Sequence, residues 1–112
     1  MIGTMMNAKE RKIQITFSSH ALQSIAGNTR ASTLLQALDE LLLTATPTGL
    51  AVLHIADKAK SDRNRIYVGI ARLIEAELVT KVRNSVYLLN PEHIHHPLFT
   101  TDAAENWQAM KA

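Results

Sequence analysis

The spacing of apolar residues changes from a helical period to a strand period at Leu78. Before it, four apolar residues recur three or four positions apart, which predicts the buried face of a helix. They are Ile66, Ile70, Leu73 and Ile74. After it, β-branched and aromatic residues stand on both sides of Asn84-Ser85, over 78–83 and 86–90, which predicts a β-hairpin. A fold for this chain must therefore place a hairpin directly after a helix.

A shorter helix is expected just upstream. Small or apolar residues lie three or four apart from Val52 to Ala59, which predicts a short helix with a small-residue inner face. Lys60-Ser61-Asp62 interrupts it, and Asp62 is a good N-cap for the helix that follows. Two helices joined by about three residues cross steeply, which is the helix-turn-helix arrangement.

The N-terminal half predicts further elements. Residues 1–10 have the composition of a loose tail, and alternating apolar residues predict a strand over Lys12–Phe17. Ser18 or Ser19 can cap a short helix that runs to about Ala26 and is ended by Gly27-Asn28.

The longest helix follows and is defined by a leucine stripe. Its inner positions are Leu34, Leu35, Leu38, Leu41, Leu42 and Ala45. Thr46-Pro47-Thr48-Gly49 ends this helix, because the residue before proline disfavours helical torsion angles. In the extension over 92–112, Asp102 and Glu105 have capping-box spacing ahead of Trp107 and Met110.

Composition narrows the functional classes. The 112 residues are 46% hydrophobic, enough for one domain with its own core. Without cysteine there is no disulfide framework or thiolate nucleophile, and no apolar run is long enough to span a membrane. We expect a soluble, cytoplasmic protein. The positive charge is concentrated in one part of the chain. Residues 54–90 hold seven Lys and Arg against four Asp and Glu, a net charge of +3. A local excess of this kind can mark a site that binds a polyanion.

From Leu53 the chain reads LHIADKAKSDRNRIYVGIARLIEAELVTKVRNSVYLLNP. This segment resembles the core of winged helix-turn-helix regulators from prokaryotes. Its "YLLNP" ending and the preceding leucine-striped helix look most like plasmid replication and maintenance proteins of the RepL family, over roughly residues 30–91. One departure is Glu77, where the family usually has a glycine that ends the recognition helix in a left-handed turn.

The resemblance implies a mainly α fold with a small β-hairpin, of the α+β class. It implies a single winged-helix domain over 1–112, with the helix-turn-helix and wing in 50–91. Residues outside 50–91 form N- and C-terminal extensions.

The recognition helix carries the candidate base contacts opposite its apolar stripe. Arg65 can pair bidentately with guanine, Asn64 with adenine, and Val68 can touch a thymine methyl. Arg72 lies on the same side. Tyr67 lies on the flank, where it can either pack its ring or offer its hydroxyl to a phosphate.

Other cations suit the DNA backbone. Lys58, Lys60 and Arg63 fall near the turn and the helix ends, where phosphates would lie. Lys81, Arg83 and Asn84 surround the hairpin tip and can reach an adjacent minor groove or its phosphates.

Enzyme and metal chemistry find little support. Asp39 and Glu40 are neighbours on a helix and cannot form a facing acid–base pair. His93, His95 and His96 offer zinc or nickel ligands. Because the chain lacks cysteine and prolines flank this segment, we interpret them as loop side chains. We expect no enzymatic activity, metal or other cofactor.

The sequence therefore predicts a homodimer that binds double-stranded DNA selectively, as a transcriptional or replication regulator. The resemblance to the RepL family implies that it is carried by a plasmid or phage. The dimer interface is expected among the leucine-striped helix, the N-terminal strand and helix, and the C-terminal segment. Two alternatives remain open: a winged-helix module that binds another protein, and a replication initiator or partition protein that binds repeated sites.

Overall fold

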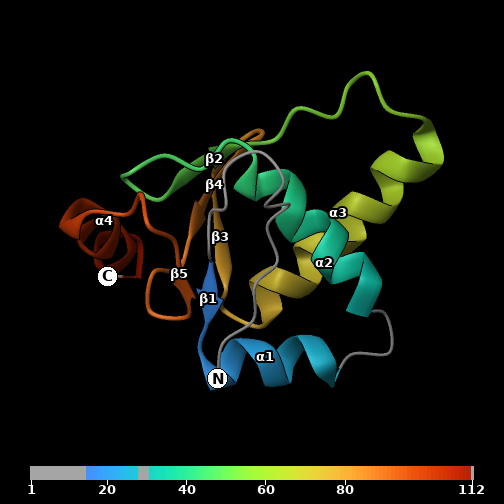
Figure 1. Cartoon of the computed structure of the whole chain (residues 1–112). Coiled ribbons are helices and arrows are strands. Elements are labelled where there is room, and N and C mark those ends of the chain that lie inside the picture. The colour runs from blue at the N-terminus through green and yellow to red at the C-terminus, as the bar shows by residue number, and fades with distance from the viewer. Residues whose placement is uncertain (1–14, 28–30, 112) are drawn as a thin grey trace.

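The computed structural model describes residues 15–27 and 31–111 (Figure 1). Within them the chain forms four helices and two small antiparallel sheets, an α+β fold as predicted. The helices are α1 (Ser19–Ala26), α2 (Ala31–Leu42), α3 (Lys60–Glu75) and α4 (Thr101–Lys111). The strands are β1 (Thr16–Phe17), β2 (Leu50–Val52), β3 (Val79–Arg83), β4 (Val86–Leu89) and β5 (Ile94–His95).

The strands form one sheet of three and one of two. β4 lies between β2 and β3, and β1 pairs with β5. The predicted hairpin is confirmed, with β3 and β4 joined through Asn84-Ser85 and an irregularity between Lys81 and Arg83. In Figure 1, α2 and α3 lie to the right of the strands and α4 to the left.

Gly69 sets the distance between α2 and α3. A Cβ at this position would lie 2.5 Å from the carbonyl oxygen of Thr33 and 2.7 Å from Cβ of Ala37. Around this approach, α2 and α3 bury the side chains that form the centre of the core. They are Leu34, Leu38, Leu41, Leu42, Ile66, Ile70 and Leu73. The packing presses one face of α3 inward and leaves the other in solvent.

The helix predicted from Val52 to Ala59 is wrong. Val52 belongs to β2, and the chain then runs as an extended segment into a turn before α3 begins. Leu53 and Ile55 are buried whereas His54 between them is exposed, so this stretch has the period of a strand. The backbone N–H of Leu53 donates to the carbonyl of Ser85, 2.7 Å away, which extends the pairing beyond β2. Tertiary pairing therefore prevails over the spacing of the small residues.

Two expected caps also differ. α3 begins at Lys60 after Ala59, which makes no side-chain capping bond, and Asp62 lies in the first turn, where its charge favours the helix dipole. α4 is capped by Thr100, whose hydroxyl accepts from the backbone N–H of Asp102 at 3.2 Å. Asp102 is thus a first-turn residue and not the cap.

Two residues that were predicted to lie on buried helix faces, one on α2 and one on α3, are exposed instead. Leu35 and Ile74 are each 37% exposed, and the buried face of α3 is formed by Ile66, Gly69, Ile70 and Leu73. α2 ends at Leu42, so Ala45 follows the helix. Gly49 then turns the chain with φ of 88°, in agreement with the predicted stop.

The N-terminal predictions are confirmed where the structure describes them. Ser18 caps α1, because its Oγ accepts from the backbone N–H of Ala21 at 3.1 Å, and Gly27 follows the last helical residue. The predicted strand is confirmed over Thr16–Phe17, whereas Ile15, which is buried, precedes the strand. The tail over 1–10, the start of the strand over 12–14, and Asn28 lie outside the described residues. In the part that is described, no helix is both long and apolar enough to cross a membrane.

Candidate nucleic-acid interface

The outward face of α3 carries the predicted base-reading residues. Asn64, Arg65, Val68 and Arg72 are all exposed, because the opposite face packs against α2. Val68 is 41% exposed, so an apolar side chain stands in water among polar neighbours. An α-helix with such a face has the width that fits a major groove. Lys60, at the start of α3, is exposed as well.

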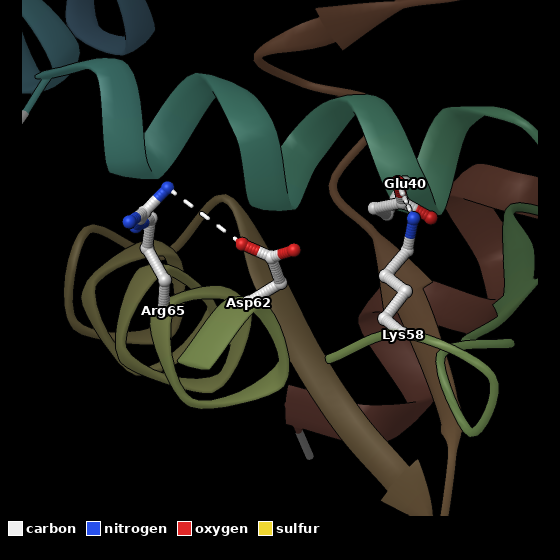
Figure 2. Close-up of polar contacts among 4 residues, drawn as sticks. All are labelled: Glu40, Lys58, Asp62 and Arg65. Atoms are coloured by element: carbon white, nitrogen blue, oxygen red, sulfur yellow. Dashed lines mark ion pairs between the residues drawn. The ribbon is translucent and has the colours of Figure 1, made fainter. Parts of the chain in front are cut away.

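Both arginines on this face have a weakly held acidic neighbour. Arg65 Nη1 lies 3.9 Å from Asp62 Oδ1, and Arg72 Nη1 lies 3.7 Å from Glu75 Oε1. The arginine side chains are 54% and 50% exposed, so water screens both pairs. Figure 2 shows the Asp62 and Arg65 side chains turned toward one another. Exposed pairs of this kind contribute little, so either guanidinium can turn to a phosphate or base without a large loss.

Lys58 is engaged elsewhere. Its Nζ lies 3.2 Å from Glu40 Oε2 on α2, and the Glu40 side chain is only 18% exposed (Figure 2). This pair ties the segment before α3 to α2. The contact between Lys58 and Glu40 was not predicted, because β2 and two loops separate these residues and no local spacing indicates it. Lys58 is therefore a weaker candidate for a phosphate contact than predicted.

Arg63 also has a structural role. Its Nη1 donates to the carbonyl oxygens of Ala56 and Lys58, at 3.1 and 3.3 Å. These bonds satisfy two carbonyls of the segment that forms no helix, and they hold that segment against the start of α3. A phosphate contact would have to use the other guanidinium nitrogens.

Tyr67 stands at the edge of a groove between α3 and the hairpin. The groove has a volume of about 450 Å³ and is bounded by the 53–57 segment, Arg63, Tyr67 and Ser85. Tyr67 is half exposed, so its ring only partly packs. Tyr87 lies behind it in the core, where burial, together with the nearby Tyr67, raises the pKa of the Tyr87 hydroxyl. His54 and Ser85 line this groove without having been predicted.

The hairpin tip presents its predicted polar residues to solvent. Lys81, Arg83 and Asn84 are exposed, and Ser85 has a positive φ of 63° that closes the turn. The arrangement brings the tip and α3 to two sides of the same groove. Arginine or lysine on a hairpin is suited to phosphates or to a minor groove.

The three C-terminal histidines have separate environments. His93 Nδ1 lies 2.7 Å from Ser18 Oγ, and its ring centroid is 4.6 Å from that of His20. His96 is buried, stacks on Phe99 and accepts the backbone N–H of Leu98 through Nδ1 at 3.0 Å. His95 is exposed.

Burial lowers the pKa of His96, and burial followed by His20 lowers that of His93. Among residues 15–27 and 31–111, no group of three or more His, Asp or Glu side chains is placed to hold a metal ion.

Comparison with models of protein families finds no match, and searches for similar curated proteins and for similar solved structures also find none. The resemblance to winged-helix regulators and to the RepL family stays a prediction. The case for a nucleic-acid interface therefore depends only on the exposure, charge and contacts of the residues described above.

Proposed function

We propose that this protein binds double-stranded DNA selectively, as a homodimeric regulator of transcription or replication. The observation that carries the proposal is the outward face of α3. Asn64, Arg65, Val68 and Arg72 are all exposed there, beside a hairpin that presents Lys81 and Arg83. Planar hydrogen-bonding side chains on a helix suit base edges, and flanking cations suit phosphates.

The order of elements supports a winged-helix architecture. α2, β2, α3, β3 and β4 follow one another, and β4 lies between β2 and β3. In this proposal α3 is the recognition helix and the β3–β4 hairpin is the wing. An extended segment, fastened by Arg63 and Lys58, stands where the first helix of a helix-turn-helix would lie.

The test is selection from a randomised duplex pool, followed by anisotropy titrations of the enriched sequences over a salt series. We expect an enriched inverted repeat whose affinity falls as salt rises, because each phosphate contact releases counterions. Arg65→Ala and Arg72→Ala should each weaken specific binding by about 1–3 kcal/mol where the side chain reads a base. The matched control is Ala104→Glu, which changes the net charge equally at an exposed position of α4.

Several outcomes would redirect the proposal. Direct repeats would favour a replication initiator or partition protein over a repressor. Unchanged affinity in both arginine variants would remove α3 from the interface. An absence of both enrichment and salt-sensitive binding would contradict DNA binding and favour a module that binds another protein.

A further inference from the structure

A second groove lies where the C-terminal end of α3 meets β3 and α4. It has a volume of about 200 Å³, and none of its residues is a predicted DNA contact. We name it the α3–α4 groove; it is lined by Ile74, Glu77, Val79, Thr80, Trp107, Met110 and Lys111. Ile74 and Met110 are large apolar residues at its rim, yet they are 37% and 45% exposed. Exposure of these two apolar side chains to water is less favourable than their burial would be.

Two opposite charges accompany this apolar surface. Glu77 and Lys111 are both exposed and both line the groove. In the part of the chain that the structure describes, neither belongs to an ion pair. One carboxylate and one ammonium therefore remain available at the same apolar surface.

One residue that lines the groove also carries an unsatisfied donor. Trp107 is 3% exposed, and its Nε1–H has no acceptor among the described residues. A buried N–H without a partner is unfavourable by about 1–3 kcal/mol. An unsatisfied donor on a lining residue, together with two exposed apolar side chains, is more typical of an interface than of a solvated surface.

We propose that the α3–α4 groove is the two-fold interface of a homodimer, an inference that rests on the proposed function and gives it a geometry. A two-fold interface uses the same patch on both copies, so the patch must be complementary to itself. An apolar centre with one anion and one cation meets this requirement. Glu77 of each copy faces Lys111 of the partner subunit, while Ile74 and Met110 pack across the axis.

The position of this surface along α3 agrees with binding to two half-sites. Arg65 lies nine residues before Ile74 on α3, about 14 Å along the helix axis. Two copies joined near Ile74, with axes about 8–10 Å apart, separate the helix axes at their Arg65 positions by at most roughly 29 Å, and the arginine side chains extend outward from those axes. Recognition helices of a dimer meet half-sites about 34 Å apart. Joining the copies at this end of α3 therefore leaves both outward faces within reach of successive major grooves.

Charge reversal with mixing tests this interface directly. Glu77→Lys and Lys111→Glu each place like charges across the two-fold axis, so we expect each variant alone to lose dimerisation affinity about tenfold or more in sedimentation velocity. An equimolar mixture of the two variants restores both cross-axis pairs, and we expect it to form dimers again. Rescue by mixing separate chains cannot come from a contact within one chain. Glu105→Lys, at an exposed position on the side of α4 opposite Trp107, changes the net charge by two units as the reversals do and serves as the charge control.

The remaining outcomes are equally decisive. A monomeric wild-type chain across the concentration series, or a wild-type dimer that both reversals leave intact, would overturn the inference. If either reversal lowers the melting temperature, Met110→Glu at an exposed position gives the same test of the apolar centre. Binding of the variants to a single half-site separates the two proposals: monomers that still bind half-sites leave DNA binding in place, whereas a wild-type dimer without DNA affinity contradicts only the proposed function.

Discussion

Glu77 holds a backbone conformation that usually requires glycine. Its φ is 63°, and the helix end around it is closed by two bonds, from Glu77 N–H to the carbonyl of Ile74 and from Leu78 N–H to that of Leu73, both 3.0 Å. This is the Schellman arrangement. Asn90 Nδ2 donates to the Glu77 carbonyl at 2.7 Å and fixes the same peptide. The departure of the sequence from the glycine pattern therefore changes the residue but not the turn.

A comparison of Glu77→Gly with Glu77→Ala measures the strain. Both variants remove the carboxylate, but only glycine removes the Cβ that disfavours a left-handed residue. We expect the glycine variant to exceed the alanine variant by about 1 kcal/mol in the free energy of unfolding, measured by urea denaturation. Measurement at low protein concentration excludes any contribution from dimers. Equal stability of the two variants would contradict the argument from backbone strain.

His96 makes the stability depend on pH. Burial lowers its pKa, so the unfolded chain binds a proton at about 6.5 while the folded chain resists protonation. The stability from the neutral ring is therefore complete above that pH and is lost as the pH falls toward the folded pKa. His96→Asn keeps an acceptor for the Leu98 N–H without an imidazole.

We expect His96→Asn to lose less stability than the wild type between about pH 7.5 and about pH 5.5 in urea denaturation. His93 contributes in the same direction, since its pKa is also lowered, so part of the dependence persists. His54→Asn, at an exposed position, controls for the loss of an imidazole as such. A wild-type pH dependence in the His96 variant would show that this ring is not its source.

At the scale of elements, α2 and α3 can approach closely because Gly69 has a hydrogen atom where other residues have a Cβ. Helix propensity alone predicts that Gly69→Ala stabilises α3 by about 1 kcal/mol. The added Cβ would meet the Thr33 carbonyl oxygen at 2.5 Å, and a backbone atom in α2 cannot move aside as a side chain can. We expect steric overlap to prevail and the variant to lose about 1–3 kcal/mol of stability.

Thermal and urea unfolding of Gly69→Ala, beside Ala71→Val as the control, decide between these effects. Ala71 is exposed on the same helix, so its substitution reports side-chain bulk and propensity without a helix contact. We expect a loss of roughly 0.5 kcal/mol there. A stabilised Gly69→Ala would show that α2 and α3 can separate without penalty.

Elements whose signals are local could be predicted from the sequence. The capping serine of α1, the leucine stripe of α2, the Gly49 turn and the hairpin each depend on residues close together in the chain. The segment over 53–59 could not be predicted, because its conformation depends on a bond from Leu53 to Ser85 and on the Arg63 guanidinium. The spacing of its small residues fits a helix, but these distant partners favour an extended segment.

Some features of the candidate interface could likewise be predicted from local sequence, whereas others depend on distant residues. Exposure of Asn64, Arg65, Val68 and Arg72 follows from the helical period, so the sequence sufficed to predict it. The engagement of Lys58 depends on Glu40, which lies on a different helix. A cation count treats all these side chains alike, whereas the fold separates those that face solvent from those that hold the chain together.

At the scale of the whole molecule, the two grooves divide the surface into two proposed tasks. The groove beside Tyr67 connects α3 to the hairpin tip, whereas the α3–α4 groove lies at the other end of α3. Arg63 and Asp57 line the first groove, which borders the hairpin that presents Lys81 and Arg83, whereas Glu77 and Lys111 line the second groove. A protein organised in this way can join two copies at the C-terminal end of α3 and leave the outward face of each helix, from Asn64 to Arg72, for DNA.

The salt dependence of DNA binding tests this division, through a comparison of Arg83→Ala with Lys58→Ala. Each variant loses one positive charge, so a model based on net charge predicts the same effect for both. The structure predicts different effects, because Arg83 is exposed at the hairpin tip whereas Lys58 lies 3.2 Å from the Glu40 carboxylate. A side chain that contacts a phosphate contributes about 0.9 to the slope of log affinity against log salt.

We therefore expect Arg83→Ala to reduce the magnitude of that slope by about 1 on duplexes of any sequence, while Lys58→Ala leaves it nearly unchanged. Lys58→Ala should instead lower the stability, since it removes the tie between α2 and the segment before α3. Anisotropy titrations over a salt series measure the slope, and urea denaturation measures the stability. An Arg83→Ala slope equal to that of the wild type would mean that Arg83 does not contact a phosphate and would exclude the hairpin tip from the interface, whereas equal reductions in both variants would favour the model based on net charge.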